Sequence, residues 1–138
     1  LIAAPPFLGP FLGPFLGLFL AAQSVPATPA LSLQQQTSLR CAAAFAIVAE
    51  GQAKRNAEAL AYPPLAERGR EFFVRSAARI MDEAGLDRTQ ISAALSAEAQ
   101  KLWNEGTLDE AMPACLLLLD ASGIPDTERE RSGSAQAN

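Results

Sequence analysis

The stretch CAAAFAIV, residues 41–48, is apolar at every position and begins directly after Arg40, the first charged residue of the chain. Ser32 and Gln35, shortly before it, have the spacing of a helix capping box. Four side chains of the stretch recur at spacings of three and four residues, the period of one helix face: Cys41, Ala44, Phe45 and Val48. The pattern predicts that these side chains form the buried stripe of a long helix over residues 32–60.

Proline, glycine and capping residues divide the chain after this helix. Pro63-Pro64 ends the first helix, because a residue that precedes proline is held out of helical geometry. Pro64 can then open a second helix over residues 65–84. Gly85 follows as a C-terminal cap, and Asp87 with Gln90 forms a second capping box, which begins a third helix that ends near residue 105.

The last predicted helix covers residues 113–121, because Pro113 separates it from a short turn. Thr107 and Glu110 fit a third capping box ahead of that turn. The run CLLLL, residues 115–119, is apolar on every side of a helix and is expected to be buried. The lone tryptophan is expected on the buried stripe of the third helix, whose members are Ile91, Leu95, Leu102 and Trp103.

The sequence shows no alternating strand pattern, so it predicts an all-α fold. The expected architecture is a small bundle of four helices, or five if Gly51 breaks the first helix. We assign the folded domain to residues 28–123. Residues 124–138 are predicted to be a disordered polar tail, because this segment has too little apolar surface to offset the entropy cost of ordering it.

The tetrapeptide PFLG occurs three times in succession over residues 6–17. It lies within an apolar run followed by small residues, which is typical of a secretory signal peptide. We therefore expect residues 1–27 to be a cleaved signal, with cleavage at Ala22, Ala27 or Ala30. The repeated prolines and glycines disfavour a permanent membrane helix. The mature protein is expected in the periplasm or outside the cell, with no stable transmembrane anchor.

Cys41 and Cys115 are the two cysteines of the chain. In an oxidising compartment they are expected to form one long-range disulfide. The alternative is a pair of free buried thiols, since unpaired cysteine is among the most frequently buried residue types.

Composition excludes several kinds of chemistry. The chain has no histidine, which removes the usual general base and the most common zinc ligand. Its net charge is −4 at neutral pH, whereas nucleic-acid-binding domains usually have a basic face. We therefore expect no cofactor, no metal and no nucleic-acid partner.

Three arginines of the second predicted helix, Arg68, Arg75 and Arg79, lie within one stripe beside its apolar face. They are the candidate contacts for an anion or a protein partner. The alternative is a solvent-exposed edge of ion pairs, in which Glu71 pairs with Arg75 and Arg79 with Glu83. Asp120, after the leucine run, is expected to pair with an arginine or to cap a neighbouring backbone.

Three function classes follow from these observations. The first is a small exported helical protein that acts by binding, most directly to another protein. The second is a carrier of a small apolar ligand inside the bundle, where aromatic residues would either line the ligand site or fill the core: Phe45, Phe72, Phe73 and Trp103. The third is a histidine-free hydrolase that uses two carboxylates, which requires a cleft that brings them together.

Overall fold

The computed structural model describes residues 29–137, which contain helices and no strands. The predicted signal peptide and two of its three candidate cleavage sites, Ala22 and Ala27, lie outside these residues. The helices are α1 (Leu33–Ala53), α2 (Ala57–Leu60), α3 (Arg68–Ala84), α4 (Arg88–Glu105), α5 (Leu108–Ala121) and α6 (Thr127–Gln136). The all-α prediction is confirmed.

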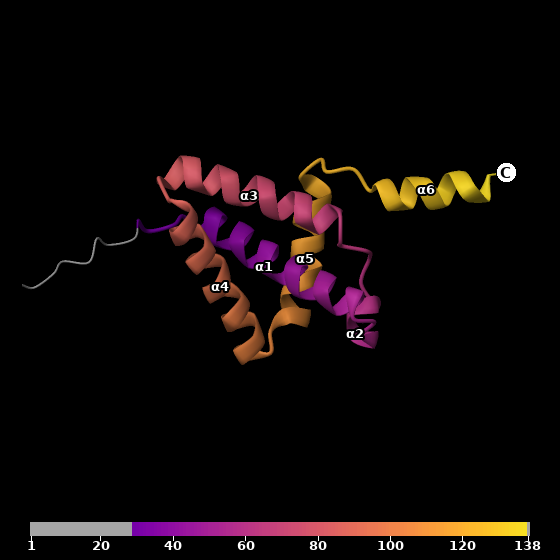
Figure 1. The fold of residues 1–138 in the computed structure, drawn as a ribbon, viewed down its shortest axis with the longest axis horizontal. Coiled ribbons are helices and arrows are strands. Elements are labelled where there is room, and N and C mark those ends of the chain that lie inside the picture. The colour runs from indigo at the N-terminus through magenta and orange to yellow at the C-terminus, as the bar shows by residue number, and fades with distance from the viewer. Residues whose placement is uncertain (1–28, 138) are drawn as a thin grey trace, which may run out of the picture.

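The helix α1 lies at the centre of the bundle, and α3, α4 and α5 pack around it (Figure 1). The predicted stripe of α1 is buried, but burial extends beyond one face, because all five residues 41–45 are inaccessible to solvent. Five consecutive buried positions on a helix require neighbours on every side. The three alanines at positions 42–44 allow those neighbours to approach α1 closely.

The most extensive packing of α1 is against α3. The rings of Phe45 and Phe72 meet edge to face, with their centroids 5.3 Å apart and their planes at 81°. Gly69 makes this approach possible, because a Cβ at its position would lie 3.1 Å from the Cβ of Phe45. The aromatic side chains Phe45 and Phe72 are therefore part of the core.

The two capping boxes expected at Ser32 and Asp87 are both formed. Gly85 ends α3 in the left-handed conformation at φ 67°, and the amide of Leu86 donates to the carbonyl of Met81. The third predicted capping box is wrong, since the Thr107 side chain makes no cap hydrogen bond. Its hydroxyl instead accepts a hydrogen bond of 3.0 Å from Arg40 Nη2.

The first predicted helix is divided, but the break expected at Gly51 in the five-helix alternative is wrong. The break follows Ala53, and Arg55 at φ 60° turns the chain into α2. Gly51 stays inside α1, where it provides space for α2: a Cβ there would lie 2.7 Å from the Cβ of Ala59. The predicted start of the second helix at Pro64 and Leu65 is wrong, because α3 begins at Arg68.

The predictions for α5 need two corrections. Pro113 does not divide this helix, which continues from Leu108 to Ala121. Because Pro113 has no N–H, the helix lacks one hydrogen bond near its start. The leucine run is not buried on all sides, because α5 packs through Met112, Cys115 and Leu119 and leaves Leu117 72% exposed. The main helix neighbour of α5 is α1, and Leu116 and Leu118 are only partly buried against the core.

Trp103 is not a core residue. It is 77% exposed, whereas Ile91, Leu95 and Leu102 of the same helix are buried. Trp103 follows Leu102 directly, so it lies about 100° further around α4 and outside the surface that α1 covers.

The end of the chain differs from the predicted disordered polar tail. Ile124 is buried in the core, and residues 127–136 form α6, which projects from the bundle (Figure 1). The Asp126 side chain caps α6 by accepting a hydrogen bond from the amide of Arg129. Local bonds of this kind require no apolar core.

The predicted disulfide is formed. Cys41 and Cys115 are 74 residues apart in sequence and lie on α1 and α5, with Cα atoms 5.1 Å apart and an S–S distance of 2.07 Å. Both residues are buried. The bond joins the middle of the central helix to the inner face of the last helix of the bundle.

Replacing both cysteines by alanine should lower the free energy of unfolding by about 4 kcal/mol, because the bridge closes a long loop in the unfolded chain. Urea denaturation of the variant and of the oxidised protein measures the difference. The oxidised protein treated with a reductant should unfold at the same lower urea concentration as the variant. A loss below about 1 kcal/mol would contradict the loop-closure argument.

Candidate functional site

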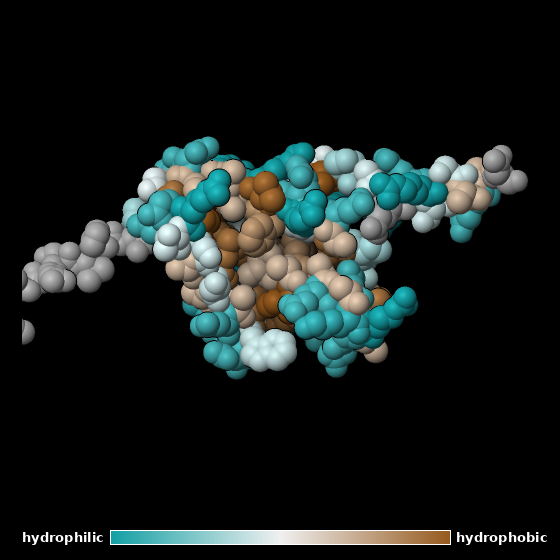
Figure 2. Space-filling view, in the orientation of Figure 1, coloured by the Kyte–Doolittle hydropathy of each residue, from teal (hydrophilic) through white to brown (hydrophobic). Residues whose placement is uncertain are grey.

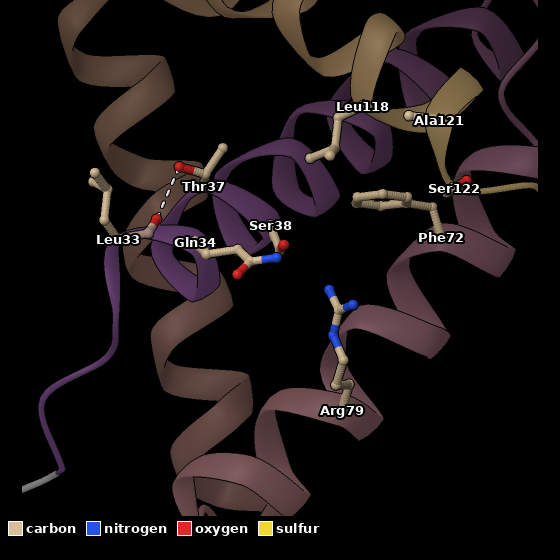
Figure 3. Close-up of a pocket in the computed structure, with 9 residues that line it drawn as sticks. All are labelled: Leu33, Gln34, Thr37, Ser38, Phe72, Arg79, Leu118, Ala121 and Ser122. Atoms are coloured by element: carbon tan, nitrogen blue, oxygen red, sulfur yellow. Dashed lines mark hydrogen bonds between the residues drawn. The ribbon is translucent and has the colours of Figure 1, made fainter.

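A groove with a volume of about 630 Å³ lies on the surface between α1, α3 and α5 and is open to solvent (Figure 3). Within each helix, the lining residues are one, three, four or seven positions apart in sequence, so they lie on one face of that helix. The lining residues are Leu33, Gln34, Thr37, Ser38, Phe72, Arg79, Leu118, Ala121 and Ser122. The groove is mostly apolar, and Arg79 is its one charged side chain.

The side chain of Arg79 extends from α3 into the space between Phe72 and residues 34–38 of α1 (Figure 3). Within residues 29–137 it forms no hydrogen bond or ion pair. Its predicted partner, Glu83, instead accepts a hydrogen bond of 3.2 Å from Gln35 Nε2. The guanidinium of Arg79 is therefore available to a ligand at the edge of an apolar surface.

Arg68, the first of the three predicted contact residues, has a structural role. Its Nη2 lies 2.9 Å from Asp120 Oδ1, and its Nε donates to the carbonyl of Ile124 at 3.0 Å. The Arg68 side chain is only 17% exposed. These bonds tie the start of α3 to the end of α5, and so they hold two walls of the groove together.

Arg75 forms the exposed ion pair that the sequence predicted with Glu71, at 2.6 Å. The structure therefore separates the three arginines. Arg68 links two helices, Arg75 pairs within α3, and Arg79 alone lines the groove.

Changing Arg68 to alanine should lower the free energy of unfolding by about 1–2 kcal/mol, because it removes two charge-assisted bonds from a largely buried side chain. The matched change of Arg75 to alanine should cost at most about 0.5 kcal/mol, since it removes an exposed pair within one helix. Urea denaturation of both variants compares them. Equal losses would show that Arg68 does not hold α3 to α5.

A second cavity, of about 450 Å³, lies at the other end of α1, against α2 and the start of α5. Three carboxylates line it: Glu50, Glu58 and Asp109. The Lys54 ammonium, which donates to Glu50 at 2.7 Å, lowers the pKa of the Glu50 carboxyl below its usual value. This exposed ion pair therefore favours the charged form of the Glu50 carboxyl.

Tyr62 also lines this second cavity. Its hydroxyl donates a hydrogen bond of 2.6 Å to Asp109 Oδ1. This hydrogen bond, with some burial and the charge of Asp109, raises the pKa of Tyr62 to about 12. The bond stabilises the fold below the ordinary tyrosine pKa of about 10 and loses this contribution as the pH rises through about 12.

Changing Asp109 to asparagine should return the pKa of Tyr62 toward about 10, because the charged acceptor is lost. Tyr62 is the only tyrosine of the chain, so the ultraviolet absorbance of tyrosinate reports on it alone. Circular dichroism at each pH establishes that the protein is folded during the titration. Identical titration curves for the two proteins would contradict the role of this hydrogen bond.

A third cavity, of about 310 Å³, lies between α1 and α3 and has an almost entirely apolar lining. It includes Phe73, which is partly buried. Figure 2 shows apolar side chains gathered over the middle of one face of the bundle, between α3 and α4. All three cavities are open to solvent, and the interior is occupied by packed side chains.

Sequence reasoning did not predict the groove or the second cavity. It found Arg79 by the spacing of arginines on one helix, but it placed Trp103, which lines the second cavity, in the core. Leu33 and Leu118 have no local sequence feature that marks them as groove residues. Their common surface exists only because α1, α3 and α5 meet.

Comparisons with protein-family models, curated proteins and solved structures found no match for this chain. Over residues 29–137, no three histidine, cysteine or acidic side chains are grouped so that they could hold a metal ion. None of the helices described above combines the length and the apolar character needed to cross a membrane.

Proposed function

We propose that this protein is an exported binding module that takes an amphipathic, acidic helix of a partner protein into the groove between α1, α3 and α5. One observation carries the proposal: the unpaired Arg79 guanidinium at an open apolar groove. The proposal includes no nucleic-acid partner, in agreement with the net charge of −4.

The geometry of the groove supports a helical partner. Two helices that pack on a third leave a channel along which a fourth helix can lie. The groove also exposes apolar surface to solvent, because the side chain of Leu33, which lines it, is 79% exposed. A partner helix with apolar residues at spacings of three, four and seven would cover such a strip.

The charge of Arg79 supports an acidic partner. The neighbouring Phe72 and Leu118 are apolar, so a bound helix would displace water around the guanidinium. An ion pair formed there is strengthened by the lower local dielectric. Arginine is also one of the residue types that most often dominates binding energy at protein interfaces.

Export is supported by two independent features. The disulfide between Cys41 and Cys115 is of the kind that persists in oxidising compartments. Residues 1–27 have the apolar run and small residues of a secretory signal. Terminal sequencing of the protein isolated from the cell envelope or the medium would test the expected cleavage after Ala22, Ala27 or Ala30.

A charge-reversal experiment tests the binding proposal. The probe is a designed amphipathic peptide helix with leucines on one face and one glutamate beside them, compared with the same peptide carrying lysine instead. The protein should bind the glutamate peptide at least about twofold more tightly, the range of a surface ion pair. Changing Arg79 to glutamate should reverse this preference. Fluorescence anisotropy of labelled peptides gives the dissociation constants.

The matched control is Arg75→Glu, which reverses a charge on the same helix outside the groove. It should leave the peptide preference unchanged. Equal binding of both peptides, or an equal effect of the two variants, would overturn the proposal. If native mass spectrometry showed one small molecule bound to each chain of the purified protein, that result would favour the carrier function instead.

A further inference from the structure

The only tryptophan and the only tyrosine of the chain line the same cavity. This cavity lies between the C-terminal half of α1, α2 and the start of α5, and α4 contributes Trp103 at its rim. Trp103 is 77% exposed and contributes little to the core. An aromatic surface left in solvent at the edge of a cavity is suited to contact with a ligand.

The charged side chains that line this cavity have a net negative charge. The cavity is lined by three carboxylates and one ammonium, that of Lys54, which already pairs with Glu50. Asp109 accepts the hydrogen bond of Tyr62. The remaining lining is mostly apolar and includes Ile47, Val48, Ala59 and Leu108.

Aromatic rings, an apolar floor and excess negative charge together suit an organic cation. The face of an indole attracts cations, most strongly when they shed little water on binding. The carboxylates are not grouped as metal ligands within residues 29–137. One oxygen of Glu50 and one of Asp109 already accept hydrogen bonds, from Lys54 and Tyr62. Within residues 29–137 the Glu58 carboxylate accepts none, so its charge is the one that faces the cavity without a partner.

We propose that this cavity binds a small quaternary ammonium ion, with Trp103 against its methylated nitrogen and Glu58 supplying the nearby negative charge. A quaternary nitrogen has no N–H to donate, so an aromatic ring face and a nearby carboxylate can bind it without a hydrogen bond. The site lies at the opposite end of α1 from the groove with Arg79 and is independent of the partner-helix proposal.

Titration of the full chain with choline, followed by the fluorescence of its single tryptophan, tests this site. Sodium chloride is replaced stepwise by choline chloride, so that the ionic strength stays constant. Choline should produce a saturable change in the emission. Its neutral carbon analogue, in which a tert-butyl group replaces the trimethylammonium group, should bind at least about threefold more weakly, because it lacks the charge. An equal response to both compounds, or no saturable response to choline, would overturn the proposal.

Two variants locate the site, with choline binding measured by calorimetry. Trp103→Leu should weaken choline binding at least about threefold, because the ring face is lost. Glu58→Gln should weaken it about twofold or more, whereas Glu110→Gln, which removes the same charge just outside the cavity, should leave it unchanged. Both target side chains are exposed, so thermal unfolding should show intact folds. Unchanged binding in Trp103→Leu, or equal effects of the two glutamine variants, would contradict the assignment.

Discussion

The complete burial of residues 41–45 of α1 is the constraint on which the rest of the structure depends. A helix that is buried at consecutive positions needs neighbours on all sides, and α3, α4 and α5 are those neighbours. Three alanines and Gly69 allow short separations between the helices. The outer helices do not cover α1 along its whole length, and open cavities remain beside it.

The disulfide lies between the two candidate sites. On α1, Cys41 stands between the groove residues 33–38 and the cavity residues 47–54. On α5, Cys115 stands between Leu108 and Asp109 of the cavity and Leu118 of the groove. One covalent bond therefore fixes the wall that α5 contributes to both sites. The bond at Arg68 adds a second connection, from α3 to the end of α5.

Several local patterns were sufficient, although the capping pattern at Thr107 was not, because Arg40 hydrogen-bonds the Thr107 hydroxyl. The capping boxes at Ser32 and Asp87 and the left-handed Gly85 depend on neighbouring residues, and they were predicted correctly. Local patterns failed where burial decides. Trp103 and Leu117 are apolar and occur in helices that pack on the core, yet both are exposed because no helix covers their side of α4 or α5. The spacing of arginines on α3 could not reveal which of them would find partners.

The sequence by itself determined the helical class, the helix ends at Ser32, Gly85 and Asp87, and the buried stripe of α1, because each depends on periodicity or capping. It favoured the pairing of the two cysteines, and the structure joins them. Only the tertiary structure decided which apolar residues are exposed and what surrounds each charge. Arg68, Arg75 and Arg79 share one helix and one chemistry. They differ in their surroundings because Asp120 approaches the first, Glu71 lies one turn from the second, and the third faces an open groove between helices that are distant in sequence.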